Sequence, residues 1–240
     1  MALKTFLWDN KTFSISYEII NPKNKEAILF LHGWGSNKEI MKQAFINRFG
    51  EYKHIYVDMP GFGKSKNNYI LHTIDYAKII QSFLDAINSA PSIIIGHSFG
   101  GKVSTLLNPK NLVLLSSAGI VEKKSAKTLL TIRMAKIFNK FGLKKVTKLL
   151  RSSDVNMMSE NMYETFKNVV DEDFSEYFKN YKGNALLFWG KQDSATTLSS
   201  GKYINSLIKN SKFKSYSGDH YFFLQVADDI EKVIKQNILG

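Results

Sequence analysis

The sequence predicts an α/β fold in which a parallel sheet is covered by helices on both faces. Two observations support this prediction. Short continuous apolar runs recur along the chain, as expected for strands that are buried on both sides. Longer stretches with spaced apolar residues separate these runs, and an alternation of strands with helices is typical of a parallel sheet.

The expected strands follow from these apolar runs. The first, Phe13–Ile20, alternates apolar and polar residues, whereas the second, Ala27–Leu31, is apolar throughout. The third, Ile55–Val57, is short and ends at Asp58. The remaining strands are expected at Ser92–Ile95, Leu112–Leu115, Leu186–Trp189 and Phe213–Tyr216.

The stretches between the strands carry apolar residues at the spacing of amphipathic helices. Helices are expected at Lys38–Phe49, Thr73–Asn88, Thr197–Lys209 and Tyr221–Ile238. A glycine-rich turn after the fourth expected strand opens a further helical stretch, which is short because it soon reaches Asn108-Pro109.

One region breaks the alternation, because no convincing strand occurs between Ile120 and Lys182. Apolar residues recur there at helical spacing (Leu130, Met134, Ile137, Phe138 and Phe141), and a further helix is expected at Asn161–Val170. We therefore expect residues 120–182 to form a helical cap, inserted into a core made of residues 1–119 and 183–240. Met134, Phe138 and Phe141 are the candidate cap residues of a substrate pocket.

The composition is that of a globular protein, with 44% hydrophobic residues and no cysteine. The lack of cysteine excludes disulfides, thiolate metal sites and a cysteine nucleophile. The apolar runs, such as Ala27–Leu31 and Ala185–Trp189, are far shorter than the ~20 residues that span a bilayer. The first ten residues also lack the apolar run of a signal peptide. We expect a cytoplasmic protein without a transmembrane segment.

The formal net charge of +12 is concentrated in one segment. Ten basic residues and no acidic residue lie between Lys123 and Arg151. We do not expect nucleic-acid binding, because no motif of a known nucleic-acid-binding module is present. The segment is either a solvated helix face or a surface for an anionic partner. Candidate partners are an anionic small substrate, an acidic membrane surface and an acidic carrier protein.

A candidate nucleophile, Ser98, lies in Gly96-His97-Ser98-Phe99-Gly100-Gly101, directly after an isoleucine-rich strand. A strand, a sharp turn and a helix form the nucleophile elbow, in which the residues two before and two after the serine must be very small. Gly96 and Gly100 meet this requirement. The backbone N–H of Phe99, at the start of the helix, is a candidate oxyanion donor.

A serine needs a base, and His220 is the best placed of the five histidines. It follows the last expected strand and precedes the final helix. Asp193 lies in the loop after the preceding strand and is the candidate acid that orients the base. Asp219 is its nearest rival, but neighbouring side chains usually point apart.

The second oxyanion donor is expected in His32-Gly33-Trp34-Gly35, after the second strand. The backbone N–H of Trp34 is the candidate, and His32 is expected to be structural. The loop from Asp58 to Ser65 lacks the spacing of a phosphate-binding loop. Asp58 is therefore expected to stabilise this turn.

Together these motifs resemble the α/β-hydrolase superfamily, in its branch of small esterases, C–C-bond hydrolases and aminopeptidases. The resemblance rests on segments in the family's order: His32–Gly35, Asp58–Ser65, Gly96–Gly101, Trp189–Asp193 and Gly218–His220. It implies a mostly parallel eight-stranded sheet with a cap after the sixth strand. Two departures are the short helix after Ser98 and the acidic Asp219, where many relatives have a small residue.

The leading functional prediction is hydrolysis of a small carboxylic ester through an acyl-enzyme, without a metal or organic cofactor. A C–C bond hydrolase and an acyl-carrier-protein methyl ester esterase are alternatives on the same triad. A non-catalytic binding module is disfavoured by the complete set of Ser98, Asp193 and His220. The loop at His32–Gly35 resembles that of esterases that demethylate pimeloyl-carrier-protein esters, which dock an acidic carrier on a basic cap.

Overall fold

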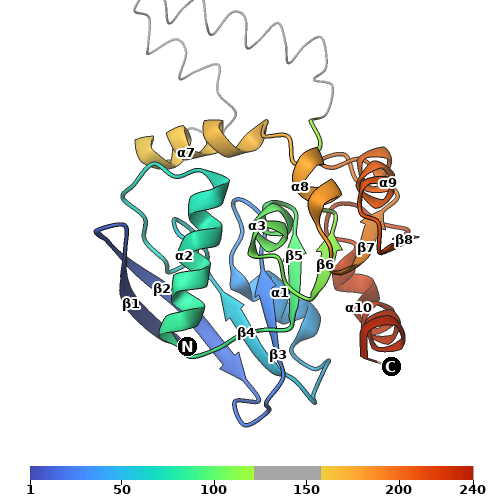
Figure 1. The fold of residues 1–240 in the computed structure, drawn as a ribbon, viewed down its shortest axis with the longest axis horizontal. Helices are drawn as coiled ribbons and strands as arrows, with labels where there is room; N and C mark the ends of the chain where they lie inside the picture. Colours follow the sequence, from blue (N-terminus) through green and yellow to red (C-terminus); the bar gives the residue numbers. More distant parts are fainter. Residues whose placement is uncertain (122–157, 240) are drawn as a thin grey trace, which may run out of the picture.

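The computed structural model describes residues 1–121 and 158–239, and one eight-stranded sheet forms its centre (Figure 1). The strand order is β1-β2-β4-β3-β5-β6-β7-β8. The first two pairings are antiparallel and the other five are parallel, which confirms the predicted sheet. The strands are β1 (Ala2–Trp8), β2 (Lys11–Ile20), β3 (Ala27–Leu31), β4 (Lys53–Val57), β5 (Ile93–His97), β6 (Asn111–Leu115), β7 (Asn184–Gly190) and β8 (Ser211–Tyr216).

Helices cover both faces of this sheet, as the sequence predicts (Figure 1). The described helices are α1 (Lys38–Phe45), α2 (Thr73–Ala86), α3 (Phe99–Leu107), α7 (Glu160–Val170), α8 (Ser175–Asn180), α9 (Leu198–Leu207) and α10 (Phe223–Ile234), with a π-helical turn at Lys235–Leu239. Residues of α1 and α10 pack in one apolar cluster, and residues of α2 and α3 pack in another.

The strand β5 shows why the central strands read as continuous apolar runs. Ile93 and Ile95 belong to the cluster with α1 and α10, whereas Ile94 belongs to the cluster with α2 and α3. All five residues of β5 are buried, because both faces of the sheet are covered. The strand therefore holds its last residues, and the turn that follows, on a rigid support.

The first strand, β1, is not among those expected from the sequence. β1 pairs with β2 as an antiparallel hairpin through Asp9 and Asn10, which have φ values of 49° and 55°. Two consecutive positive φ angles are the mark of a tight type I′ hairpin turn, for which Asp and Asn are suited. One side of β1 is exposed and carries Leu3 and Leu7, while Lys4 lies on the half-buried side, so the strand shows no regular alternation of apolar and polar residues.

The four helices expected between the strands all differ from the observed ones at one or both ends, and α1 and α10 differ most. α1 ends at Phe45, four residues earlier than expected, and the chain reverses direction at Phe49, whose φ is 51°. The last helix, α10, begins at Phe223 instead of Tyr221. Helix boundaries depend on capping and packing that apolar spacing does not encode.

The expected cap is described only in part. β6 ends at Leu115 and β7 begins at Asn184, so the insertion follows the sixth strand. Its helix at 161–170 is observed as α7, which is anchored to the core by hydrogen bonds at Leu71 and Asn67. The candidate pocket residues Met134, Phe138 and Phe141 lie outside the described residues, as does the basic segment. The division into core and cap stays a prediction.

A buried histidine fixes the turn before β4, at the edge of the sheet where the parallel strands begin. His54 is fully buried; its Nε2–H donates to Phe49 O and its Nδ1 accepts from the Tyr56 hydroxyl, each at 3.0 Å. Burial lowers the pKa of His54, so the ring is held neutral.

Among the described residues, no helix is long and apolar enough to cross a membrane. The cytoplasmic location stays a prediction.

Candidate active site

Ser98 lies in the turn between β5 and α3 (Figure 1), with φ 52° and ψ −116°. This conformation is strained for a residue with a side chain, and it persists only where the surroundings impose it. Crowding explains the two glycines beside it. A Cβ on Gly96 would lie 2.5 Å from Gly100 O, and a Cβ on Gly100 would lie 2.5 Å from Leu31 O. The turn therefore matches the elbow that the sequence predicts.

Backbone hydrogen bonds impose this conformation from both sides. The N–H of Ser98 donates to Leu115 O at 3.1 Å, so the turn is tied to the end of β6. The carbonyl of Ser98 accepts from Gly101 N–H at 2.9 Å and from Ala118 N–H at 3.1 Å. The position of the serine is thus set by two strands and a helix.

The structure brings Asp193 and His220 together from the loops after β7 and β8. His220 Nδ1 donates to Asp193 Oδ2 at 2.7 Å. The two loops are also joined directly, because Gln192 N–H donates to Gly218 O at 3.0 Å. By contrast, Asp219 accepts from the N–H of Tyr221 at 2.8 Å, within its own loop. Of the two candidate acids, only Asp193 has a hydrogen bond to the base.

The Asp193 carboxylate is held in its charged form. Burial alone would raise its pKa, but hydrogen bonds from His220 and the backbone of Thr196 outweigh burial and lower the pKa to about 2. Oδ1 accepts from the N–H groups of Ala195 and Thr196 at 2.8 and 2.9 Å. A permanent negative charge on Asp193 keeps the proton on His220 Nδ1 and leaves Nε2 free to accept another.

The loop after β3 passes directly beside the elbow. A Cβ on Gly33 would lie 3.1 Å from Ser98 Cβ, so only a glycine fits there without displacing the serine. The rings of Trp34 and Phe99 meet edge to face, with centroids 5.4 Å apart. The side chains of the two residues whose N–H groups are the candidate oxyanion donors are therefore in contact.

His32 holds this loop in place by hydrogen bonds, as expected of a structural residue. Its Nδ1–H donates to Gly33 O at 2.8 Å, and its Nε2 accepts from the N–H of Met59 at 3.0 Å. Burial lowers the pKa of His32 to about 4, so it stays neutral near pH 7. Both ring nitrogens are occupied, and neither is left for substrate.

Asp58 stabilises its turn, as predicted. Its carboxylate accepts from the Lys38 side chain at 2.7 Å and from the N–H groups of Lys38 and Lys64 at 2.8 and 3.0 Å. Burial would raise the pKa of Asp58, but these hydrogen bonds lower it below its usual value. The carboxylate is committed to the loop and has no catalytic position.

A pocket of about 610 Å³ opens beside the loop after β3, His32–Gly35, which we call the oxyanion loop because it carries the candidate donor Trp34. Its other sides are formed by the loop after β4, the start of α7 and the residue after His220. Its lining residues are Trp34, Gly35, Gly61, Phe62, Met158, Ser159, Met162 and Tyr221. None of these is charged, so the pocket suits an uncharged group of a substrate. Of these residues, only Trp34 is predicted from the sequence to belong to the site. Met162 comes from helix α7 and the others from loops, and apolar spacing does not show which of their side chains face a pocket.

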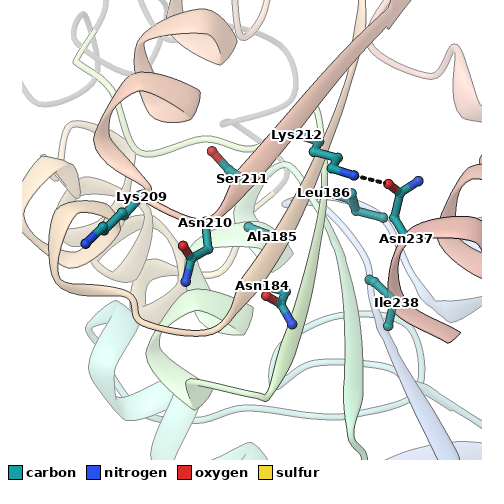
Figure 2. Close-up of a pocket in the computed structure, with 9 residues that line it drawn as sticks. All are labelled: Asn184, Ala185, Leu186, Lys209, Asn210, Ser211, Lys212, Asn237 and Ile238. Atoms are coloured by element: carbon teal, nitrogen blue, oxygen red, sulfur yellow. Dashed lines mark hydrogen bonds between the residues drawn. The ribbon is translucent and has the colours of Figure 1, made fainter. Parts of the chain in front are cut away.

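A second pocket, of about 260 Å³, lies where β7 and β8 begin (Figure 2). Ser98 follows the other end of its parallel strand, β5, so this pocket is remote from it. Figure 2 shows its polar residues, among which the Lys212 side chain donates a hydrogen bond to Asn237 Oδ1. Its lining contains neither histidine nor carboxylate. Over the described part of the chain, no group of three or more His, Asp or Glu residues could hold a metal ion.

Comparisons with known proteins agree with this geometry. A family model for the alpha/beta hydrolase fold matches residues 26–226. A pimeloyl-[acyl-carrier protein] methyl ester esterase of Wigglesworthia glossinidia brevipalpis is 27% identical over 197 residues, which cover 79% of this chain and 68% of that protein. The hydrolase YugF of Bacillus subtilis is 24% identical over 230 residues, or 82% of this chain and 84% of that one.

A similar fold occurs in the solved structure of an esterase, EaEST, from Exiguobacterium antarcticum. It aligns with a TM-score of 0.74 at 18% identity, over 95% of this chain and 96% of that chain. At this identity the likeness concerns the fold alone.

The crowding at the elbow gives a prediction about stability. Gly96→Ala should lower the free energy of unfolding by about 2 kcal/mol or more, because the new methyl group would meet the backbone of Gly100. Gly50→Ala is the matched control, since a Cβ there meets nothing within 4 Å. Urea unfolding of both variants tests this. Equal stabilities would contradict the crowded elbow.

Proposed function

This chain belongs to the α/β-hydrolase fold family, and from that premise we propose that it cleaves a carboxylic ester through an acyl-enzyme on Ser98. The observation that carries the proposal is the 2.7 Å hydrogen bond between His220 and Asp193, in a chain whose Ser98 is held in a strained turn. The names of the relatives, an esterase among them, support an ester substrate.

The first half of the reaction forms the acyl-enzyme. His220 Nε2 accepts the proton of the Ser98 hydroxyl while Oγ attacks the ester carbonyl carbon. The negative charge that develops on the carbonyl oxygen is stabilised by the N–H groups of Trp34 and Phe99. Phe99 begins α3, and the helix N-terminus adds a partial positive charge. The C–O bond then breaks, and the His220 imidazolium gives its proton to the departing alcohol.

The second half releases the acid. His220 accepts a proton from water, whose oxygen attacks the acyl carbon, and the same N–H groups stabilise the second tetrahedral intermediate. Collapse breaks the bond to Ser98 Oγ, which takes the proton back from His220. Asp193 stays ionised throughout and stabilises each imidazolium.

The substrate group next to the site is proposed to be apolar. The pocket between Trp34, Phe62, Met162 and Tyr221 has no charged lining residue, which suits an uncharged acyl or alcohol group. We also propose that the cap residues Met134, Phe138 and Phe141 select the substrate. Cleavage of a C–C bond on the same triad would use the same groups, but no feature of the described residues favours it over an ester.

Replacing the nucleophile tests the proposal directly. Ser98→Ala should lower kcat/KM for a p-nitrophenyl ester by about 10⁴ or more, because no acyl-enzyme can form. Circular dichroism and thermal unfolding should be unchanged, since alanine fits the same turn. Near-normal turnover by this variant would rule out the mechanism.

The choice between the two acids gives a second prediction. Asp193→Asn should lower kcat by on the order of 10⁴, because the amide stabilises the wrong tautomer of His220. Asp219→Asn is the matched control, since its oxygen can still accept from Tyr221, and it should change kcat less than about threefold. The reverse order of the two effects would transfer the acid role to Asp219.

A methyl ester carried by an acidic carrier protein is a second candidate substrate. Two observations favour it. One is the similarity to the pimeloyl-[acyl-carrier protein] methyl ester esterase, whose name states this activity. The other is the sequence segment from Lys123 to Arg151, which has ten basic residues and lies outside the described residues. A concentrated positive charge accelerates association with an acidic partner, and this effect weakens with ionic strength.

Ionic strength should therefore separate the two kinds of substrate. For a carrier-linked methyl ester, kcat/KM should fall steeply with salt, and Lys136→Glu combined with Lys140→Glu should remove most of this dependence. For a small neutral ester it should stay nearly flat. Equal, flat responses would leave the basic segment a solvated surface.

A further inference from the structure

His97, the residue before Ser98, is buried at the centre of the site and has no role in the mechanism above. Its side chain is fully buried on the face of the sheet that α10 covers. Three rings surround it: His220, Tyr221 and Phe223, with centroids 4.6, 5.1 and 4.9 Å away. Two of them belong to the loop that carries the base.

The hydrogen bonds of His97 fix its tautomer. A backbone carbonyl only accepts, so the 3.0 Å contact between His97 Nε2 and His220 O requires a proton on Nε2. Nδ1 is then a bare acceptor; it is buried without a partner and lies against Gly33 of the oxyanion loop. The His97 ring therefore contacts both the loop after β8, which carries His220, and the oxyanion loop. His97 is also the residue directly before Ser98 in the chain.

We propose that His97 is a positioning residue, whose hydrogen bond to the His220 carbonyl ties the catalytic base to the strand that carries Ser98. The inference rests on the proposed function of Ser98 and His220. The tie matters because β8, which precedes the base loop, is three places from β5 in the sheet. The hydrogen bond joins two residues 123 positions apart in the sequence. It connects the loop of His220 directly to β5, so the position of the base relative to Ser98 does not depend only on the two strands in between, β6 and β7.

The surroundings of His97 keep this tie in place during turnover. Burial and the nearby His220 lower the pKa of His97 to about 3, so it stays neutral when His220 becomes an imidazolium. A second cation 4.6 Å from the base would oppose proton transfer to it. A neutral ring also keeps its Nε2 proton directed at the carbonyl.

Substitutions that separate the hydrogen bond from the packing test this role. His97→Phe keeps a ring of similar size but has no donor, whereas the amide of His97→Gln can replace the Nε2–H. His54→Phe is the matched control: it removes a buried histidine with the same 3.0 Å bond from Nε2 to a backbone carbonyl, at the opposite edge of the sheet. The readouts are kcat and KM for a small ester and the rate at which a fluorophosphonate labels Ser98.

We expect His97→Phe to lower both kcat and the labelling rate by about 10- to 100-fold with KM nearly unchanged, because a misplaced base slows the chemistry but not binding. His97→Gln should recover most of the loss, and His54→Phe should label at the wild-type rate even if it melts earlier. If His97→Phe does not fold, His97→Leu takes its place beside His97→Gln.

Wild-type labelling and kcat in the donor-free variant would overturn the inference and leave the proposed function intact. Equal losses in His97→Gln and the donor-free variant would also overturn it, because packing alone would then explain the effect. Failure of the wild type to label, or equal labelling of Ser98→Ala, would instead overturn the proposed function on which the inference rests.

Discussion

The backbone of Ser98, held at φ 52° in a turn between a buried strand and a helix, is the constraint on which the site depends. A turn this sharp needs space on both sides, and Gly96 and Gly100 provide it because any Cβ there would meet backbone atoms. The same turn places the start of α3 directly after Ser98, and the loop at Gly33 packs closely against the Ser98 side chain. The positions of the candidate nucleophile and of the Phe99 N–H therefore follow from this local conformation, and the loop that carries Trp34 approaches it at Gly33.

Neutral buried histidines hold the loops around this turn. His32 joins the loop after β3 to the loop after β4, and His97 joins β5 to the loop after β8. Burial lowers the pKa of both rings, to about 4 and about 3, so neither takes a charge near pH 7. Of the described histidines at this edge, His220 is the one with an ionised carboxylate as partner, which supports its proposed role as the base.

Much of this arrangement could be predicted from the sequence, because strands buried on both sides and a glycine-flanked serine leave clear patterns. The pairing of Asp193 with His220 could be predicted because each follows a predicted strand, and because the order Ser98, Asp193, His220 is that of the family. β1 was missed, although Asp9-Asn10 is a recognisable turn signal, because Leu3 and Leu7 lie on its exposed side and remove the alternation of apolar and polar residues. The bond from His97 to His220 had no signal at all, since it depends on how two distant strand ends meet.

The central claim is that the acyl group of the substrate is transferred to Ser98. The most direct measurement is acid quenching of the enzyme during turnover of a slowly deacylated p-nitrophenyl ester, followed by peptide mass spectrometry. The account predicts one acylated peptide, with the added mass on Ser98. Acylation of another residue, or turnover with no acylated peptide at any quench time, would contradict it.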